Sequence, residues 1–203
     1  VPPTPQFCWP QLCARTGAEV WVKHENHHAT GAFKIRGGLV YLNNLMKSGE
    51  KPRGIVTATR GNHGQSIAFA CRQHELPCVV VVPHGNSVEK NLAMQAWGAE
   101  LIEYGDDYHD AAHKAGEIAA ERELHVLPTF HPSLLQGVAT YWLEFFEAVP
   151  ALDTVYVPIG MGSGICSGIA VRDQLELSTA IVGVVSSAAA TYALSWQAGE
   201  IIE

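Results

Sequence analysis

The sequence predicts an α/β fold built on a parallel sheet, and two observations support this prediction. Short runs of apolar and β-branched residues alternate with longer stretches of helical periodicity along the 203 residues. One of these runs, CVVVV at 78–82, is apolar at consecutive positions, as in strands that are buried on both faces of a parallel sheet. Parallel strands need long crossover connections, and the helical stretches are long enough to supply them.

The strands are predicted where β-branched and aromatic residues form short runs bounded by turn residues. They cover residues 20–23, 54–58, 78–82, 100–103, 155–158 and 181–185. Helices are predicted between them, where apolar residues recur with helical spacing. They cover residues 33–46, 63–74, 88–97, 107–123, 134–148 and 188–197. Thr30, just before the first of these helices, is expected to cap it.

The composition excludes several classes of protein. Apolar residues make up 47% and charged residues 16% of the sequence, which indicates a folded globular chain. The net charge of −7 and the lack of a basic cluster argue against nucleic-acid and membrane partners. No apolar run reaches membrane-spanning length. The five cysteines are odd in number and form no C-x-x-C pair, so we expect reduced thiols and a cytoplasmic protein.

Residues 24–28 read HENHH and match the H-E-x-x-H pattern of zinc proteases. That pattern binds zinc on a helix, where residues four apart share a face. Here the preceding EVWVK favours a strand and the following ATG favours a turn. In an extended chain, residues i and i+4 lie about 13 Å apart, too far for one metal ion. We therefore expect no metal site at these histidines.

Three segments, each between a predicted strand and a predicted helix, are the candidate ligand-binding loops. Ligands of open α/β sheets bind beyond the carboxyl ends of the strands, where such loops lie. The segments read ATGAFKIRGG at 29–38, TATRGNHGQS at 57–66 and VPIGMGSGICSG at 157–168.

The third segment is rich in glycine, which lets backbone N–H groups approach an anion at the start of a helix. A dinucleotide site would need an acidic residue after the next strand, and Ser186 and Ser187 stand there instead. The G-K-[ST] sequence of a nucleotide P-loop is also missing. The segment therefore favours a site for a single phosphate group, with a structural turn as the alternative.

Lys34 stands among the apolar residues Phe33, Ile35 and Leu39 on a helix that starts at the first candidate loop. A solvated lysine on an amphipathic helix is the alternative interpretation. A lysine that is desolvated at a cleft has a lowered pKa and can form a Schiff base. A nucleophilic lysine together with a phosphate site is what a pyridoxal-phosphate enzyme requires.

In this order and spacing, the three loops resemble those of the fold-type II pyridoxal-phosphate enzymes, and most of all the threonine/serine dehydratase and serine racemase branch. PPTPQF at 2–7 and AEVWVKHEN at 18–26 are also similar to that branch. The resemblance implies a tryptophan synthase β-like fold, in which a smaller α/β domain interrupts a large domain with an open parallel sheet. The corresponding division is 1–51 with 134–203 for the large domain and 52–133 for the small one.

The resemblance also implies roles for individual residues, with pyridoxal 5'-phosphate as the cofactor. Lys34 matches the Schiff-base lysine, Phe33 the aromatic residue beside the ring, and Asn62 the asparagine that hydrogen-bonds the ring oxygen. The loop that holds the substrate carboxylate is matched by Thr59, Arg60, Gly61 and His63. The phosphate-binding loop is matched by Gly160, Met161, Gly162, Ser163 and Gly164. Met161 and Ser163 depart from the commoner all-glycine form.

The implied activity is the deamination of an amino acid, L-threonine to 2-oxobutanoate and ammonia or L-serine to pyruvate, by a homodimer. Racemisation of serine, β-replacement and a non-catalytic amino-acid-binding fragment remain as alternatives. Arg60 stands where racemases of this branch have a serine that acts as the second acid/base. Because arginine keeps its proton at neutral pH, elimination is expected to dominate over racemisation.

Members of this branch are longer than 300 residues. We therefore expect the chain to be part of a larger protein, with the residue that faces the pyridine nitrogen beyond Glu203.

Overall fold

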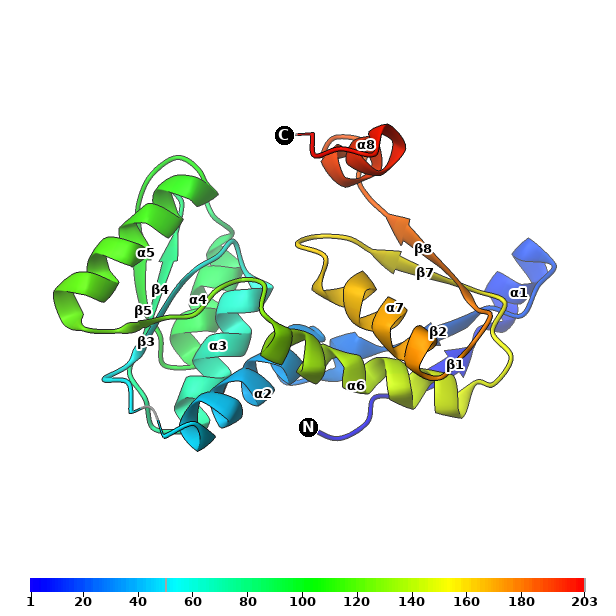
Figure 1. The fold of residues 1–203 in the computed structure, drawn as a ribbon, viewed down its shortest axis with the longest axis horizontal. Helices are drawn as coiled ribbons and strands as arrows, with labels where there is room; N and C mark the ends of the chain where they lie inside the picture. The colour runs from blue at the N-terminus through cyan, green and yellow to red at the C-terminus, as the bar shows by residue number, and fades with distance from the viewer. Residues whose placement is uncertain (50, 203) are drawn as a thin grey trace. The chain divides into compact units, whose positions relative to one another are not determined.

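The computed structural model describes residues 1–49 and 51–202 (Figure 1). Glu50 and Glu203, both within the predicted large domain, lie outside the described residues. The chain forms two compact units, Val1–Gly137 and Val138–Glu203. The division into 1–51 with 134–203 and 52–133 stays a prediction.

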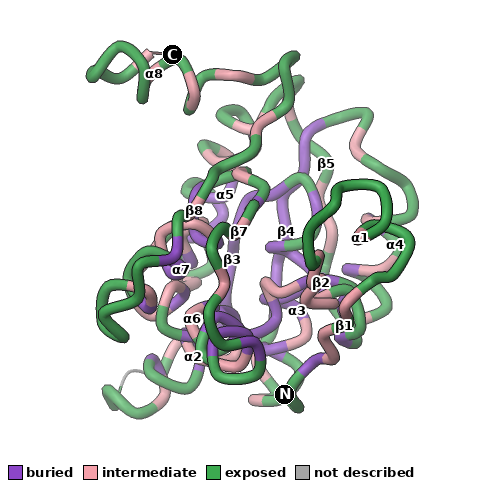
Figure 2. Tube along the Cα trace, turned by 90° about the vertical axis from the view of Figure 1, so that its right-hand side faces the viewer, coloured by how far each residue is buried: buried purple, intermediate pink, exposed green. Residues whose placement is uncertain are grey.

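The first unit contains a parallel sheet of four strands in the order β5-β4-β3-β6. The strands are β3 (Ile55–Ala58), β4 (Cys78–Val82), β5 (Glu100–Glu103) and β6 (His125–Val126). β3 and β4 are buried at every residue, as the purple parts of Figure 2 show. The predicted parallel sheet is confirmed here.

Helices cover both faces of this sheet: α2 (Lys34–Lys47), α3 (Asn62–Gln73), α4 (Val88–Ala96) and α5 (Tyr108–Arg122). Alternate residues of the central strands enter different cores. Ile55 and Val80 pack with residues of α2, α3 and α4, whereas Val56 and Val81 pack with residues of α5. Burial on both faces explains why β4 is apolar at five consecutive positions.

The N-terminal part of the first unit holds an antiparallel pair of strands, β1 (Gln6–Cys8) and β2 (Trp21–Lys23), with α1 (Pro10–Thr16) between them. Sequence analysis predicted β2 and missed β1 and α1. No residue of α1 is buried, so this helix carries no apolar stripe that would indicate it.

The start of α2 corrects one expectation. The helix begins at Lys34 with Phe33 at the N-cap, and no side chain caps it. The predicted capping by Thr30 is therefore wrong. Thr30 lies too far before the helix, and its hydroxyl donates to the backbone oxygen of Ala32 at 3.5 Å.

The second unit contains the parallel pair β7 (Thr154–Pro158) and β8 (Ala180–Val184), connected through α7 (Ser163–Gln174). The predicted helix at 188–197 begins later, as α8 (Thr191–Ala198), because Ala189 N donates to Ser186 O in a turn before it. α6 (Pro132–Ala148) includes the boundary between the units. Over residues 1–49 and 51–202, no helix has the length and apolar character needed to cross a membrane.

Candidate active site

Lys34 is the first residue of α2, and its side chain is partly withdrawn from water. Burial lowers the pKa of its ammonium group, because desolvation favours the neutral amine. The Phe33 ring lies beside it, with its centroid 5.4 Å from Lys34 Nζ. A larger share of neutral amine at a given pH makes Lys34 a better nucleophile and base than a solvated lysine.

The first turn of α2 is held against α3. Ser66 Oγ donates a 2.6 Å hydrogen bond to the backbone oxygen of Lys34. One helical turn after Lys34, a Cβ on Gly38 would lie 2.3 Å from the same Ser66 oxygen. Only a glycine at position 38 lets the two helices approach this closely, so the sequence KIRGG serves to place Lys34.

The loop after β3 brings the second set of predicted residues to the same unit. Thr59 and His63 are buried, and Gly61 N donates to Thr59 Oγ1 at 3.0 Å. Asn62 is the first residue of α3. The first N–H groups of a helix lack intrahelical partners and carry partial positive charge, so this loop offers donors to a carboxylate.

His63 is electrically neutral at physiological pH. Burial and, as the second cause, the positive charge of Lys34 lower the pKa of His63 to about 3. His63 Nε2 lies 3.2 Å from Thr57 Oγ1, and the Thr57 hydroxyl donates its own proton to Leu127 O at 2.8 Å. Nε2 is therefore the donor to Thr57. The electrostatic effect of Lys34 on His63 places these two side chains in one site.

Arg60 is exposed at the outer side of this loop. Its charge acts on Asp107, the N-cap of α5. The pKa of the Asp107 carboxyl lies below its usual value, first because the backbone N–H of Asp110 donates to it and, as the smallest cause, because of the Arg60 charge. The effect of Arg60 on Asp107 is thus small.

In the second unit, residues 160–164 run from the turn after β7 into the first residues of α7. Gly162 is the N-cap of α7 with φ 89°, a left-handed conformation that favours glycine. Ser163, the first residue of this helix, and Ser167, in its second turn, are buried, and Met161 is 48% exposed. A helix start with backbone N–H groups and serine hydroxyls is a suitable environment for a phosphate group.

Trp142 of α6 fixes the start of α7. Its indole Nε1 donates to Gly164 O at 2.9 Å. A Cβ on Gly168 would come within 2.4 Å of the Trp142 ring, so a glycine is needed where the helix crosses the indole. The glycines of this segment therefore serve close packing as well as the turn.

The HENHH segment is a structural junction in the first unit. Both carboxylate oxygens of Glu25 accept hydrogen bonds from the Arg36 guanidinium, at 2.8 and 3.0 Å. Thr4 Oγ1 donates to Glu25 at 2.6 Å, and His28 Nε2 lies 3.2 Å from the same carboxylate. Among the residues that the structure describes, no group of three or more His, Cys, Asp and Glu side chains could hold a metal ion.

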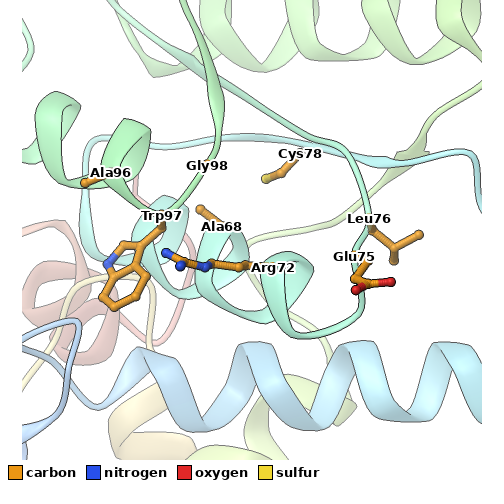
Figure 3. A pocket seen from close by; sticks show the side chains of 8 residues that line it. All are labelled: Ala68, Arg72, Glu75, Leu76, Cys78, Ala96, Trp97 and Gly98. Atoms are coloured by element: carbon orange, nitrogen blue, oxygen red, sulfur yellow. The ribbon is translucent and has the colours of Figure 1, made fainter.

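A shallow pocket lies toward the far end of α3 from Asn62, about 9–15 Å along the helix. Figure 3 shows the Arg72 side chain between Trp97 and Glu75 in this pocket. Its lining residues are Ala68, Arg72, Glu75, Leu76, Cys78, Ala96, Trp97 and Gly98. None of them is a predicted site residue.

Within the first unit the structure brings Lys34 together with the loop at 59–63, as the parallel-sheet argument implies. The predicted phosphate-binding residues 160–164 belong to the second unit and are placed at the start of α7. Sequence reasoning missed Lys90 of α4, whose side chain lies along Gly61. No motif signals this contact, because it depends on how α4 packs against α3.

Comparisons with known proteins identify the family of the chain. The family described as "Pyridoxal-phosphate dependent enzyme" matches residues 1–203. The catabolic L-threonine dehydratase TdcB of Escherichia coli strain K12 is 34% identical over 189 residues, which is 92% of this chain and 57% of the relative. The serine racemase of Bos taurus is 37% identical over 159 residues, covering 77% of this chain and 47% of the relative.

A solved structure has the same fold. The processed form of threonine deaminase isoform 2 from Solanum lycopersicum superposes with a TM-score of 0.91 and 27% identity, over 100% of this chain and 59% of that one. The chain thus spans 47–59% of the length of these three proteins. The tryptophan synthase β-like fold expected from the sequence is confirmed.

Proposed function

Since the chain belongs to the family of pyridoxal-phosphate dependent enzymes, we propose that the protein is an ammonia-lyase that converts L-threonine to 2-oxobutanoate and ammonia. L-Serine, giving pyruvate, is the proposed second substrate. The 34% identity with an L-threonine dehydratase over 92% of the chain supports threonine as the substrate.

The residues of the chain fit the cofactor of this family in two respects. The amine of Lys34 has a lowered pKa and is suited to bond covalently to an aldehyde. The start of α7, with Gly162 in a left-handed conformation and Ser163 buried, has the donors that a phosphate needs. Lys34 would hold the aldehyde carbon and residues 160–164 the phosphate. When bound, the cofactor supplies the electron sink for the electron pair left at Cα.

The remaining steps follow from the chain's own residues. The loop of residues 59–63, with the backbone N–H groups of Asn62 and His63 at the start of α3, binds and orients the substrate carboxylate. Lys34, as the neutral amine, removes the proton from Cα. The bond from Cβ to the hydroxyl then breaks, and the hydroxyl leaves as water with the proton that Lys34 took from Cα. Hydrolysis of the resulting C–N bond yields 2-oxobutanoate and ammonia.

The observation that carries this proposal is the partly buried Lys34 beside the neutral His63, at the loop that starts α3. His63 is too weak a base to take a proton at neutral pH, so we assign the base to Lys34, whose burial lowers its pKa. Phe33 and Ser66 fix the position of the lysine.

The test is the formation of 2-oxo acid by the purified holoenzyme. We expect 2-oxobutanoate from L-threonine, and a fall of several orders of magnitude in the Lys34→Ala variant, as when the reacting group of a catalytic unit is deleted. Lys47→Ala, at the exposed last residue of α2, is the matched control and should keep full turnover. Near-normal activity of Lys34→Ala, or no 2-oxo acid from the wild type, would contradict the proposal.

Serine racemisation is the second candidate, because the bovine serine racemase is 37% identical over 77% of the chain. Racemisation needs a proton-exchanging group on each face of Cα. Arg60 keeps its proton at neutral pH and is exposed, so it does not supply the second group. This argument favours elimination.

We also propose a homodimer in the cytoplasm. The five free cysteines, of which Cys71 and Cys78 are buried thiols, support a reducing compartment. Light scattering of the purified protein would measure the number of subunits.

A further inference from the structure

The loop that is proposed to bind the substrate carboxylate has few positively charged side chains that could pair with it. His63 is neutral, and Thr59, Gly61 and Asn62 carry no charge. Lys34 is assigned to proton transfer, and Arg60 is exposed to solvent. A carboxylate loses hydration when it binds to this loop. It therefore needs a positively charged partner in addition to the partial positive charge of the N–H groups at the start of α3.

Lys90 lies where such a counter-charge is needed. Its Cδ lies 2.3 Å and its Nζ 3.0 Å from the position that a Cβ of residue 61 would occupy. Because a Cα–Cβ bond is about 1.5 Å long, Nζ is within about 4.5 Å of Gly61 Cα. The distal half of the lysine therefore runs along the loop, and its ammonium group ends there.

The environment leaves this ammonium available. Lys90 is half-buried in the first turn of α4. Its neighbour Glu89 is exposed, and no ion pair within 4.0 Å joins Lys90 to an acidic side chain of residues 1–49 and 51–202. A half-buried cation without an acidic partner, beside a set of backbone N–H donors, attracts an anion.

We propose that Lys90 is the counter-ion of the substrate's α-carboxylate and so a binding residue of the active site. This inference rests on the proposed function, since it concerns the same loop. The Lys90 ammonium sets the affinity for the carboxylate, and the N–H groups of Asn62 and His63 set its orientation.

The contact also explains the glycine at position 61. A Cβ there would overlap the Lys90 Cδ, so a larger residue would displace the flexible lysine side chain from its course along the loop. Gly61 keeps the path open by which Lys90 reaches the loop.

The experiment compares two ligands that differ in the carboxylate. L-Alanine has no β-hydroxyl to eliminate, and L-alaninol carries a CH₂OH group in place of the carboxylate. Their dissociation constants are measured on the holoenzyme from the change in the visible absorption of the bound cofactor. The variants are Lys90→Met, Lys90→Arg and the exposed control Lys47→Met, with circular dichroism as the check on folding.

In Lys90→Met we expect L-alanine to bind about 10- to 100-fold more weakly, as for the loss of a charge-assisted contact, and L-alaninol to bind as before. Lys90→Arg should restore L-alanine binding to within a few-fold of the wild type. Equal weakening of both ligands, or unchanged L-alanine binding, would overturn the proposal. Because this readout is binding, it stands apart from the proposed function, which fails if the wild type forms no 2-oxo acid from L-threonine.

Discussion

Replacing Glu25 by glutamine keeps the shape of the side chain and removes its charge from the junction between β2 and α2. The Arg36 guanidinium, whose side chain is 2% exposed, then loses its carboxylate partner. The amide of glutamine can accept from one side of the guanidinium but cannot neutralise it. The change therefore removes a carboxylate from the environment of a buried guanidinium two residues after Lys34.

The expected magnitude follows from this burial. Removing one partner of a buried ion pair costs about 3–5 kcal/mol. At about 2–4 °C per kcal/mol for a chain of this length, the melting midpoint of Glu25→Gln should fall by about 6–20 °C.

A second glutamate of the chain provides a matched control. Arg122 Nη1 donates to both oxygens of Glu100, at 2.9 and 2.8 Å, but the two side chains are 42% and 52% exposed. An exposed pair contributes about 0–1 kcal/mol, so Glu100→Gln should lower the midpoint by at most about 4 °C.

The assay is thermal unfolding of wild type and both variants, followed by circular dichroism in one buffer. Equal and small shifts for Glu25→Gln and Glu100→Gln would refute the assignment of Glu25 as a structural junction. The role of the HENHH segment would then be unexplained.

The other predictions concern the two loops and the histidines. Gly162→Val places a β-branched residue at the N-cap of α7, where the backbone is left-handed. It should weaken binding of the cofactor far more than it lowers the melting midpoint of the cofactor-free protein. An equal loss in both measurements would favour a purely structural turn. Metal analysis of the dialysed protein should find no stoichiometric zinc, and a tightly held zinc at His24 and His28 would contradict the reading of HENHH. With L-serine, the wild type should form far more pyruvate than D-serine because Arg60 exchanges no proton; comparable rates would defeat that argument, and Arg60→Ser is the natural variant to compare.

The parts of the fold that sequence analysis predicted are those governed by local pattern. The consecutive apolar residues of β4 indicated burial on both faces, and the two cores on either side of the strand are the cause. Lys34 could be singled out because it is a charged residue among apolar neighbours at a candidate loop, which indicated a desolvated, nucleophilic lysine. In the structure, burial lowers the pKa of Lys34, in agreement with that prediction.

The missed parts depend on contacts between residues far apart in the sequence. α1 has no buried residue, and β6 has two residues, too few to show a period. The hydrogen bond from Ser66 to Lys34 and the approach of Lys90 to Gly61 arise from helix packing. The pairing of Glu25 with Arg36 likewise has no local sequence signal. From the sequence, the only argument against a zinc site at HENHH was therefore the predicted strand and turn around it.

The central claim is that Lys34 carries the cofactor, and borohydride reduction of the holoenzyme tests it most directly. Reduction fixes the bond between the cofactor and its lysine, and mass spectrometry of the tryptic peptides then locates the label. Trypsin does not cleave after a modified lysine, so we predict that the label lies on the peptide of residues 24–36, at Lys34. A label on another lysine, or cofactor bound with no labelled peptide, would contradict the account.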